Sequence, residues 1–218
     1  RGDKDYYVRG TFTKNNLDFS QDVLHMVELG FTQVSVEPVI SDPKLPFSIT
    51  EEDLPAIREE YDRLARIVLE RKKDGKGFNF FHFMLDLDQG PCAIKRLRGC
   101  GCGNEYAAVD PDGGVFPCHQ FVGQPEWRMG DVLTGEYDLE TKARFARANV
   151  YSKDKCRECW AKFYCSGGCN ANNQQYEGDI LHSHTLSCEL EKKRLECAIM
   201  IKAALADAQA GEQEERSH

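Results

Sequence analysis

The stretch Cys156-Arg-Glu-Cys159-Trp-Ala-Lys-Phe-Tyr-Cys165-Ser-Gly-Gly-Cys169 lies in the second half of the chain. Four cysteines at such short and unequal spacings can present their thiolates to one metal or cluster. The paired glycines relieve the backbone where it must bend sharply. Buried free thiols or disulfides explain this pattern poorly. The stretch therefore predicts metal or iron–sulfur chemistry rather than a catalytic triad.

Three further cysteines extend the pattern on both sides: Cys100 and Cys118, with Gly113 between them, and Cys188. Seven patterned sulfurs, with one more from Cys92 or Cys102, would suit two four-sulfur sites. Zinc accepts four-cysteine sites and iron–sulfur clusters use the same ligand type, so the spacing alone leaves both open.

The composition limits the classes of function. The chain has 218 residues, 41% of them hydrophobic, which is enough for a buried core. Its formal net charge of -8 argues against a nucleic-acid partner. No apolar run approaches the roughly 20 residues of a membrane span. Ten cysteines without a signal peptide point to a reducing compartment, and we expect a cytoplasmic protein.

Residues 1–89 alternate between strand and helix patterns. Strands are predicted over residues 6–13, 32–39 and 78–87. A helix is predicted from Ser20, as N-cap, to Gly30, and Thr50 with Asp53 predicts a capping box for a helix that ends near Lys73. The phenylalanines of the third strand are expected in the core: Phe78, Phe80, Phe81 and Phe83. This rhythm is typical of a parallel α/β sheet, either small and open or the second half of a barrel.

From about residue 90, glycines, cysteines and short strands replace the long periodic elements. The run Asp110-Pro-Asp-Gly-Gly114 between two short strands predicts a β-hairpin. We expect a helix over 138–148, a cysteine-rich loop over 156–169 and a closing helix over 186–208. The polar tail over 211–218 is expected to fray.

The seven cysteines and Gly113 resemble the signature of SPASM domains over about residues 91–190. These domains are C-terminal extensions of radical S-adenosylmethionine (SAM) enzymes that modify peptides. Four flanking motifs, and the predicted strands at 6–13 and 34–39, resemble the maturases of SCIFF peptides ("six cysteines in forty-five residues"). The motifs are Gly90-Pro-Cys92, Lys95-Arg-Leu97, Gly99-Cys-Gly101 and Pro117-Cys-His-Gln-Phe-Val-Gly123.

The resemblance implies an α/β plus irregular fold in three parts. Residues 1–89 would be the second half of a partial (β/α)6 radical SAM barrel, which would be incomplete here. Residues 90–210 would be a SPASM domain with a β-hairpin and a closing helix, and 211–218 a polar tail.

The resemblance also implies two auxiliary [4Fe–4S] clusters. An outer cluster would be held by Cys156, Cys159, Cys165 and Cys188. An inner cluster would take Cys100, Cys118 and Cys169, and its fourth iron could stay open for a substrate thiolate. Cys92 and Cys102 both lie close enough in sequence to compete for that iron. Cys102 departs from the family pattern, and we expect it to be a bystander thiol.

The implied reaction joins a cysteine sulfur of a ribosomally made, cysteine-rich precursor peptide to a carbon, as a thioether. A reductant such as flavodoxin or ferredoxin would be a further partner. SAM and a third [4Fe–4S] cluster would be bound by the intact enzyme, because this chain has no C-x3-C-x2-C loop. We therefore expect the chain alone to be inactive. The alternatives are an anaerobic sulfatase-type maturase and a four-cysteine zinc interaction module.

A few other polar residues carry weaker signals. Arg9 is a candidate SAM contact at a strand end, although a structural arginine is equally expected, and the same holds for Glu37. His119 follows Cys118 and could hydrogen-bond a cluster sulfur. His182 and His184 are possible zinc ligands but more typical of a solvated loop.

Overall fold

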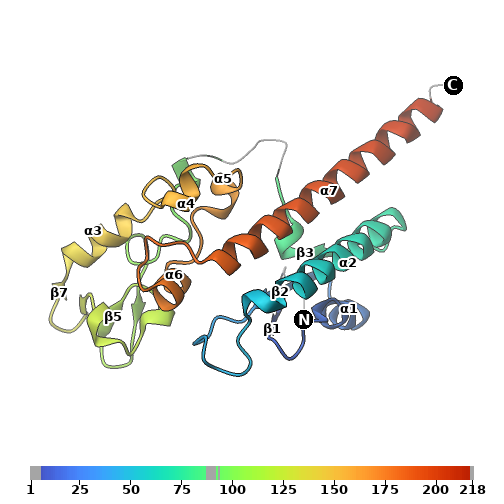
Figure 1. Ribbon diagram of the computed structural model, residues 1–218. Coiled ribbons are helices and arrows are strands. Elements are labelled where there is room, and N and C mark those ends of the chain that lie inside the picture. The colour runs from blue at the N-terminus through green and yellow to red at the C-terminus, as the bar shows by residue number, and fades with distance from the viewer. Residues whose placement is uncertain (1–5, 87–91, 93, 217–218) are drawn as a thin grey trace. The chain divides into compact units, whose positions relative to one another are not determined.

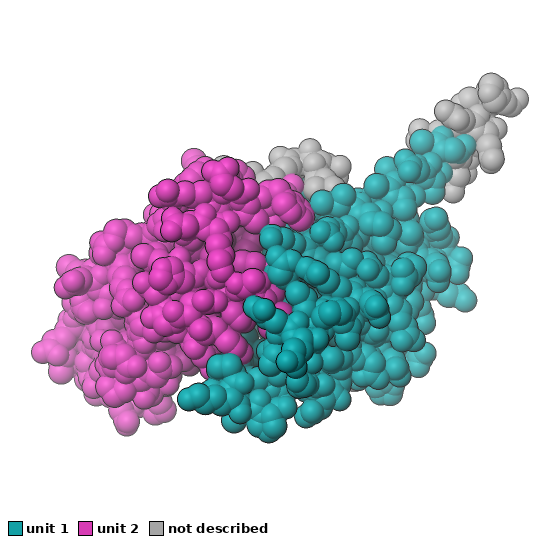
Figure 2. All heavy atoms as spheres, viewed as in Figure 1, with its two compact units in different colours: residues 1–87, 189–218 teal, residues 88–188 magenta. Residues whose placement is uncertain are grey.

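The structure, a computed structural model, describes residues 6–86, 92 and 94–216 (Figure 1). Its contacts divide the chain into two compact units, 1–87 with 189–218 and 88–188 (Figure 2). The domain scheme from the sequence had assigned residues 189–210 to the cysteine-rich part. Two parts of the sequence predictions lie outside the described residues: Leu87 at the end of the third strand, and Gly90-Pro91 of the flanking motif.

The first unit contains a parallel three-stranded sheet in the order β1-β2-β3 (Figure 1). Its strands are β1 (Val8–Phe12), β2 (Gln33–Pro38) and β3 (Asn79–Phe80). Helix α1 (Phe19–Glu28) connects β1 to β2, and α2 (Leu54–Lys73) comes between β2 and β3. The predicted alternation of strands and helices in a parallel sheet is confirmed.

Aromatic side chains from different elements build the core of this unit. Phe12 of β1 stacks on Phe19 of α1 with 4.4 Å between ring centroids, and Tyr61 of α2 lies 4.8 Å from Phe19. The other buried apolar side chains of α2 recur at helical spacing: Ile57, Leu64, Ala65 and Val68. The apolar stripe read from the sequence is therefore the face that α2 buries.

The start of α2 follows the predicted capping box. A 3-10 turn, η1 (Glu51–Asp53), leads into the helix. The Asp53 carboxylate accepts hydrogen bonds from the Thr50 backbone N–H at 2.9 Å and from the Thr50 hydroxyl at 3.0 Å. These bonds satisfy groups that a helix N-terminus would otherwise leave unpaired.

The predicted N-cap of α1 is wrong. Ser20 lies inside the helix, which begins at Phe19, and its backbone N–H donates to Glu60 Oε1 at 3.0 Å. A carboxylate from α2 thus satisfies an N-terminal N–H of α1. Because that acceptor is distant in sequence, a local capping pattern could not reveal it.

The third strand is shorter than predicted. It ends at Phe80, and η2 (Phe81–Phe83) follows. This 3-10 turn puts Phe80 and Phe83 on one side, with 4.9 Å between ring centroids, and leaves Phe81 51% exposed. The core prediction is therefore right for Phe78, Phe80 and Phe83 and wrong for Phe81.

The closing helix is longer than predicted. Helix α7 spans Thr185–Arg216, so the tail continues as helix up to Arg216 instead of fraying. Its end reads Glu-Gln-Glu-Glu-Arg, and all three residue types are good helix formers. Within the first unit α7 pairs with α2 through Arg58–Glu189 at 2.5 Å and Lys193–Asp62 at 2.6 Å.

Cys197, one of the cysteines outside the pattern, is 2% exposed on α7, and its Sγ lies 3.6 Å from the Tyr61 carbonyl oxygen. Its isolated position in the sequence favours a structural role for this thiol.

The Tyr61 hydroxyl offers a test of this core. It is buried and has no hydrogen-bond partner within the described residues, and burial raises the pKa of Tyr61 to about 12. Tyr61→Phe should therefore raise the free energy of unfolding by about 1 kcal/mol, since an unsatisfied polar group is removed. Tyr61→Ala should lower it by about 3 kcal/mol because it leaves a cavity. Urea unfolding measures both, and a loss of stability in Tyr61→Phe would mean that the hydroxyl has a partner.

The second unit contains a four-stranded antiparallel sheet in the order β4-β5-β6-β7. Its strands are β4 (Ala108–Val109), β5 (Gly114–Phe116), β6 (Gly130–Asp131) and β7 (Glu136–Tyr137). The predicted hairpin joins β4 to β5. Asp110 Oδ1 accepts from the N–H of Gly114 at 2.7 Å, and Gly113 takes a φ of 90°, which suits glycine.

Short helices make up the rest of the second unit. Asp138 caps α3 (Leu139–Arg147) by accepting from the N–H groups of Glu140 and Thr141. The segment predicted as a cysteine-rich loop carries two one-turn helices and leads into a third. The helices are α4 (Asp154–Arg157), α5 (Lys162–Cys165) and α6 (Asn170–Glu177), and the 3-10 turns are η3 (Ile94–Arg96), η4 (His119–Phe121) and η5 (Pro125–Trp127).

No helix in the described part of the chain is both long and apolar enough to cross a membrane.

Candidate metal centre

Three cysteines meet beside the sheet of the second unit. Cys118 lies shortly after the end of β5. Cys102 forms an isolated β-bridge with Tyr106. Gly103, next to Cys102, donates its N–H to the carbonyl oxygen of Pro117 at 2.9 Å. This backbone bond ties the Cys102 loop to the residue before Cys118. The thiol of Cys102 hydrogen-bonds with those of both Cys100 and Cys118.

The electrostatics of this group favour thiolates at two of the three positions. The hydrogen bond with Cys102 is the largest cause that lowers the pKa of Cys100, to about 5, and of Cys118, to about 6. The same bonds raise the pKa of Cys102. The Tyr106 hydroxyl adds a contact at 3.7 Å from Cys100 Sγ. Thiolates are the form in which cysteine binds metals.

Cys169 belongs to the same neighbourhood. It lies at the N-terminus of α6 and packs against the aromatic cluster of the second unit, which contains Phe116, Phe121, Trp127 and Phe145. Burial raises its pKa, while the backbone N–H groups of Asn172 and Ala171 lower it by hydrogen bonding, and the charges of Cys100 and Cys118 reach it. The structure thus places Cys118 and Cys169 in one hydrophobic cluster, and the assignment of an inner ligand set stays a prediction.

The predicted outer set lies on and around the short helices. Cys156 is 7% exposed on α4, and its Sγ is 3.3 Å from Ser183 Oγ. Cys159 and Cys165 are half-buried on the following turns, and Cys188 lies in the first turns of α7. The chain between Cys165 and Cys169 bends through three residues of positive φ, Ser166 at 59°, Gly167 at 89° and Gly168 at 74°. The glycines therefore relieve the bend as the sequence predicted.

Cys92 and Cys102 differ in their surroundings. Cys102 is 3% exposed and accepts a hydrogen bond from Asn170 Nδ2 at 3.7 Å besides its contacts with the two other thiols. Cys92 is exposed, and within the described residues no interaction joins it to another cysteine. The structure therefore places Cys102, not Cys92, beside the inner residues.

The remaining candidates are polar residues outside the cysteine pattern. Arg9 on β1 forms an ion pair with Glu37 on β2, and its role in SAM binding stays a prediction. His119 is exposed, and its charge lowers the pKa of Cys118. His182 is exposed, whereas His184 stacks on Tyr176 with 4.1 Å between ring centroids.

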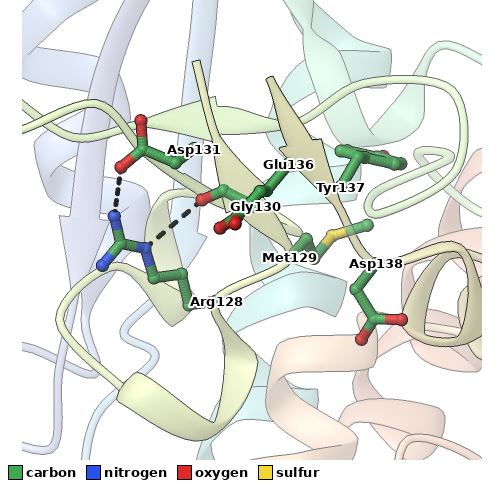
Figure 3. Close-up of a pocket in the computed structure, with 7 residues that line it drawn as sticks. All are labelled: Arg128, Met129, Gly130, Asp131, Glu136, Tyr137 and Asp138. Atoms are coloured by element: carbon green, nitrogen blue, oxygen red, sulfur yellow. Dashed lines mark hydrogen bonds and ion pairs between the residues drawn. The ribbon is translucent and has the colours of Figure 1, made fainter. Parts of the chain in front are cut away.

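A hollow of about 560 Å³ lies on the β6–β7 hairpin (Figure 3). Arg128 on its wall pairs with Asp131 at 2.5 Å and donates from Nε to the Gly130 carbonyl oxygen at 3.3 Å. No cysteine lines it, so this hollow is not part of the candidate centre. Its lining residues are Arg128, Met129, Gly130, Asp131, Glu136, Tyr137 and Asp138.

Two comparisons bear on these cysteines. Residues 100–160 match the family model of the SPASM domain, described as an iron–sulfur cluster-binding domain. This stretch includes Cys100, Cys118, Cys156 and Cys159 and ends before the last three cysteines of the pattern. No curated protein matches the chain.

The whole chain resembles solved structures of anSMEcpe. The structure of histidine-tagged anSMEcpe with bound AdoMet aligns at a TM-score of 0.67 and 18% identity, over 94% of this chain and 55% of that one. Native anSMEcpe with AdoMet and the Kp18Cys peptide aligns at 0.67, and with the Cp18Cys peptide at 0.66, each over 58% of that chain. This chain thus spans little more than half the length of those proteins and has a mixed α/β fold that resembles part of theirs.

The donor chemistry fits iron–sulfur clusters. The seven cysteines of the pattern supply thiolates, the ligand type that holds iron–sulfur clusters. Among the described residues, no three His, Cys, Asp or Glu side chains converge closely enough to hold a single metal ion. Zinc accepts thiolates as well, so the match to an iron–sulfur cluster-binding domain is what favours clusters over zinc.

Gly103 gives a test of how the Cys102 loop is held. Its φ is 71°, and a Cβ there would lie 2.5 Å from Cγ of Phe145. Gly103→Ala should lower the free energy of unfolding by more than about 2 kcal/mol, because a clash adds to the cost of a left-handed alanine. Gly123→Ala is the matched control, since its φ is 84° and nothing lies within 4 Å of its Cβ. Equal losses in urea unfolding would show that Phe145 yields without cost.

Proposed function

We propose that this chain is the auxiliary-cluster part of a radical SAM peptide maturase. The observation that carries the proposal is that Cys102, Cys118 and Cys169 pack into one hydrophobic cluster. The SPASM match and the fold likeness to anSMEcpe, which has been solved with AdoMet and peptide, support it. Cys156, Cys159, Cys165 and Cys188 would hold the outer [4Fe–4S] cluster, and the other three cysteines the inner one.

Cys102 is the proposed fourth sulfur of the inner site. Its thiol bridges those of Cys100 and Cys118, and it is buried with them. The backbone bonds from Gly103 to Tyr106 and Pro117 hold its loop beside the segment that carries Cys118. We propose this role in place of the bystander role expected from the sequence, with Cys92 outside the site.

The proposed reaction is thioether formation in a cysteine-rich precursor peptide, as the SCIFF-like flanking motifs imply. A peptide that forms such a bond loses one hydrogen atom to the deoxyadenosyl radical, one proton from the thiol and one electron. A bound cluster would supply the acceptor for that electron. Cys102, Cys118 and Cys156 are buried, so they would hold such an acceptor and shield it from solvent.

A sulfatase-type maturase is the second candidate, and the position of Cys102 favours it. Four protein sulfurs at the inner site would leave no iron open for a substrate thiolate. Such an enzyme oxidises a peptide cysteine or serine to an aldehyde without forming a sulfur–carbon crosslink.

Mass spectrometry separates the two candidates. The intact enzyme is incubated without oxygen with SAM, a reductant such as flavodoxin, and a cysteine-rich precursor peptide. Thioether formation predicts the loss of two hydrogen atoms and of one alkylatable thiol, with no carbonyl. A carbonyl that reacts with a hydrazide favours the sulfatase-type reaction. An unchanged peptide despite SAM cleavage would contradict both.

A further inference from the structure

Lys153 is the most deeply buried charged side chain near the cysteines. It is 1% exposed, although lysine is almost never fully buried without a partner. Its Nζ donates to the Gly167 carbonyl oxygen at 2.7 Å and to Asn170 Oδ1 at 2.9 Å. Both acceptors are neutral, and no carboxylate within the described residues forms an ion pair with it. The geometry thus leaves a buried ammonium without a counter-charge.

The groups that face Lys153 electrostatically are cysteines of both predicted sites. Burial is the main cause that lowers its pKa, and the electrostatic influence of four cysteine sulfurs opposes this shift. Two of them, Cys156 and Cys165, belong to the outer set, and two, Cys102 and Cys169, to the inner site. A cation that lies within reach of both sets would find its missing counter-charge in the thiolates and in the clusters that they bind.

We infer that Lys153 is the shared counter-charge of the two clusters and sets their reduction potentials. The inference rests on the proposed pair of [4Fe–4S] clusters. The potential of such a cluster depends on the net charge around it and on hydrogen bonding, so a buried cation should make each cluster easier to reduce. The effect should be larger at the outer cluster, because Cys156 is its strongest electrostatic partner. Lys153 is a positioning residue as well, since it fixes Gly167 between Cys165 and Cys169.

The test is a redox titration of the reconstituted chain, followed by electron paramagnetic resonance. Lys153→Met keeps most of the side-chain volume and removes the charge. We expect it to shift the reduction equilibrium of the outer cluster at least tenfold toward the oxidised form, which is about 59 mV for one electron. The inner cluster should shift in the same direction by less. Lys155→Met is the matched control, because Lys155 is exposed on α4, the helix that follows Lys153, and its charge is screened by solvent.

The outcomes separate the inference from the proposed function. Unchanged potentials in Lys153→Met with full iron content would overturn the inference and leave the clusters in place. If Lys153→Met loses its clusters, Lys153→Arg decides: retention of iron with near-wild-type potentials supports a role of the charge. Loss of iron from both variants would overturn it, since the lysine would then act only through its hydrogen bonds. A wild-type chain without iron would overturn the cluster assignment itself.

Discussion

Cys156→Ala should remove about half of the iron and labile sulfide from the reconstituted chain, because one of two four-iron clusters loses a ligand. Cys156 is the most buried cysteine of the outer set, and Ser183 contacts its sulfur. The inner cysteines Cys100, Cys102 and Cys118 do not depend on Cys156. The end of β5 and the backbone bonds of Gly103 hold their segments in place. The spectrum of the inner cluster should therefore persist. Iron and sulfide assays with electron paramagnetic resonance measure both effects.

Cys197→Ala is the matched control for this loss. Cys197 is as buried as Cys156 but lies on α7 against the Tyr61 carbonyl. It should keep its full iron content, although it loses a buried sulfur. Equal loss of iron in the two variants would mean that general instability, not ligation, removes the metal. Loss of all iron in Cys156→Ala would mean that the chain has a single site.

Cys102→Ala should open one iron of the inner cluster without removing the cluster. The thiol of Cys102 bonds with those of Cys100 and Cys118, so its loss leaves three protein sulfurs at that site. Added cysteine-containing peptide should then change the spectrum of the variant, because a free thiolate can occupy the open position. The wild-type spectrum should not respond.

Cys92→Ala is the control, because Cys92 is exposed and has no interaction with another cysteine in the described structure. It should retain wild-type iron content and remain insensitive to added thiol. If the wild type itself responds to the peptide, the inner iron is open, as the family resemblance implied, and Cys102 is a bystander. If Cys92→Ala responds in its place, Cys92 is the fourth ligand.

Much of the fold could be predicted because its signals are local. The Thr50–Asp53 capping box and the turn at Asp110 lie within a few residues of the structure they form. The apolar spacing of α2 marks its buried face in the same way. The misses have distant causes. Glu60 replaces a cap at α1, and the turn that ends β3 depends on burying Phe83 beside Phe80.

The same distinction between local and distant signals applies to the candidate centre. The resemblance to SPASM domains implied which cysteines belong together, and the structure places two of the inner three, Cys118 and Cys169, in one hydrophobic cluster. The place of Cys102 could not be read from the sequence, because it depends on backbone bonds from Gly103 to Tyr106 and Pro117. Sequence reasoning missed Lys153 because a single lysine before a cysteine belongs to no sequence motif. Only its burial and its neutral acceptors reveal it.

The central claim is that this chain holds two [4Fe–4S] clusters. It is tested most directly by iron and labile-sulfide counts on the chain reconstituted without oxygen, together with a zinc assay. We predict a brown protein with about eight irons and eight sulfides per chain and no stoichiometric zinc. A colourless protein with bound zinc and no labile sulfide would contradict the claim.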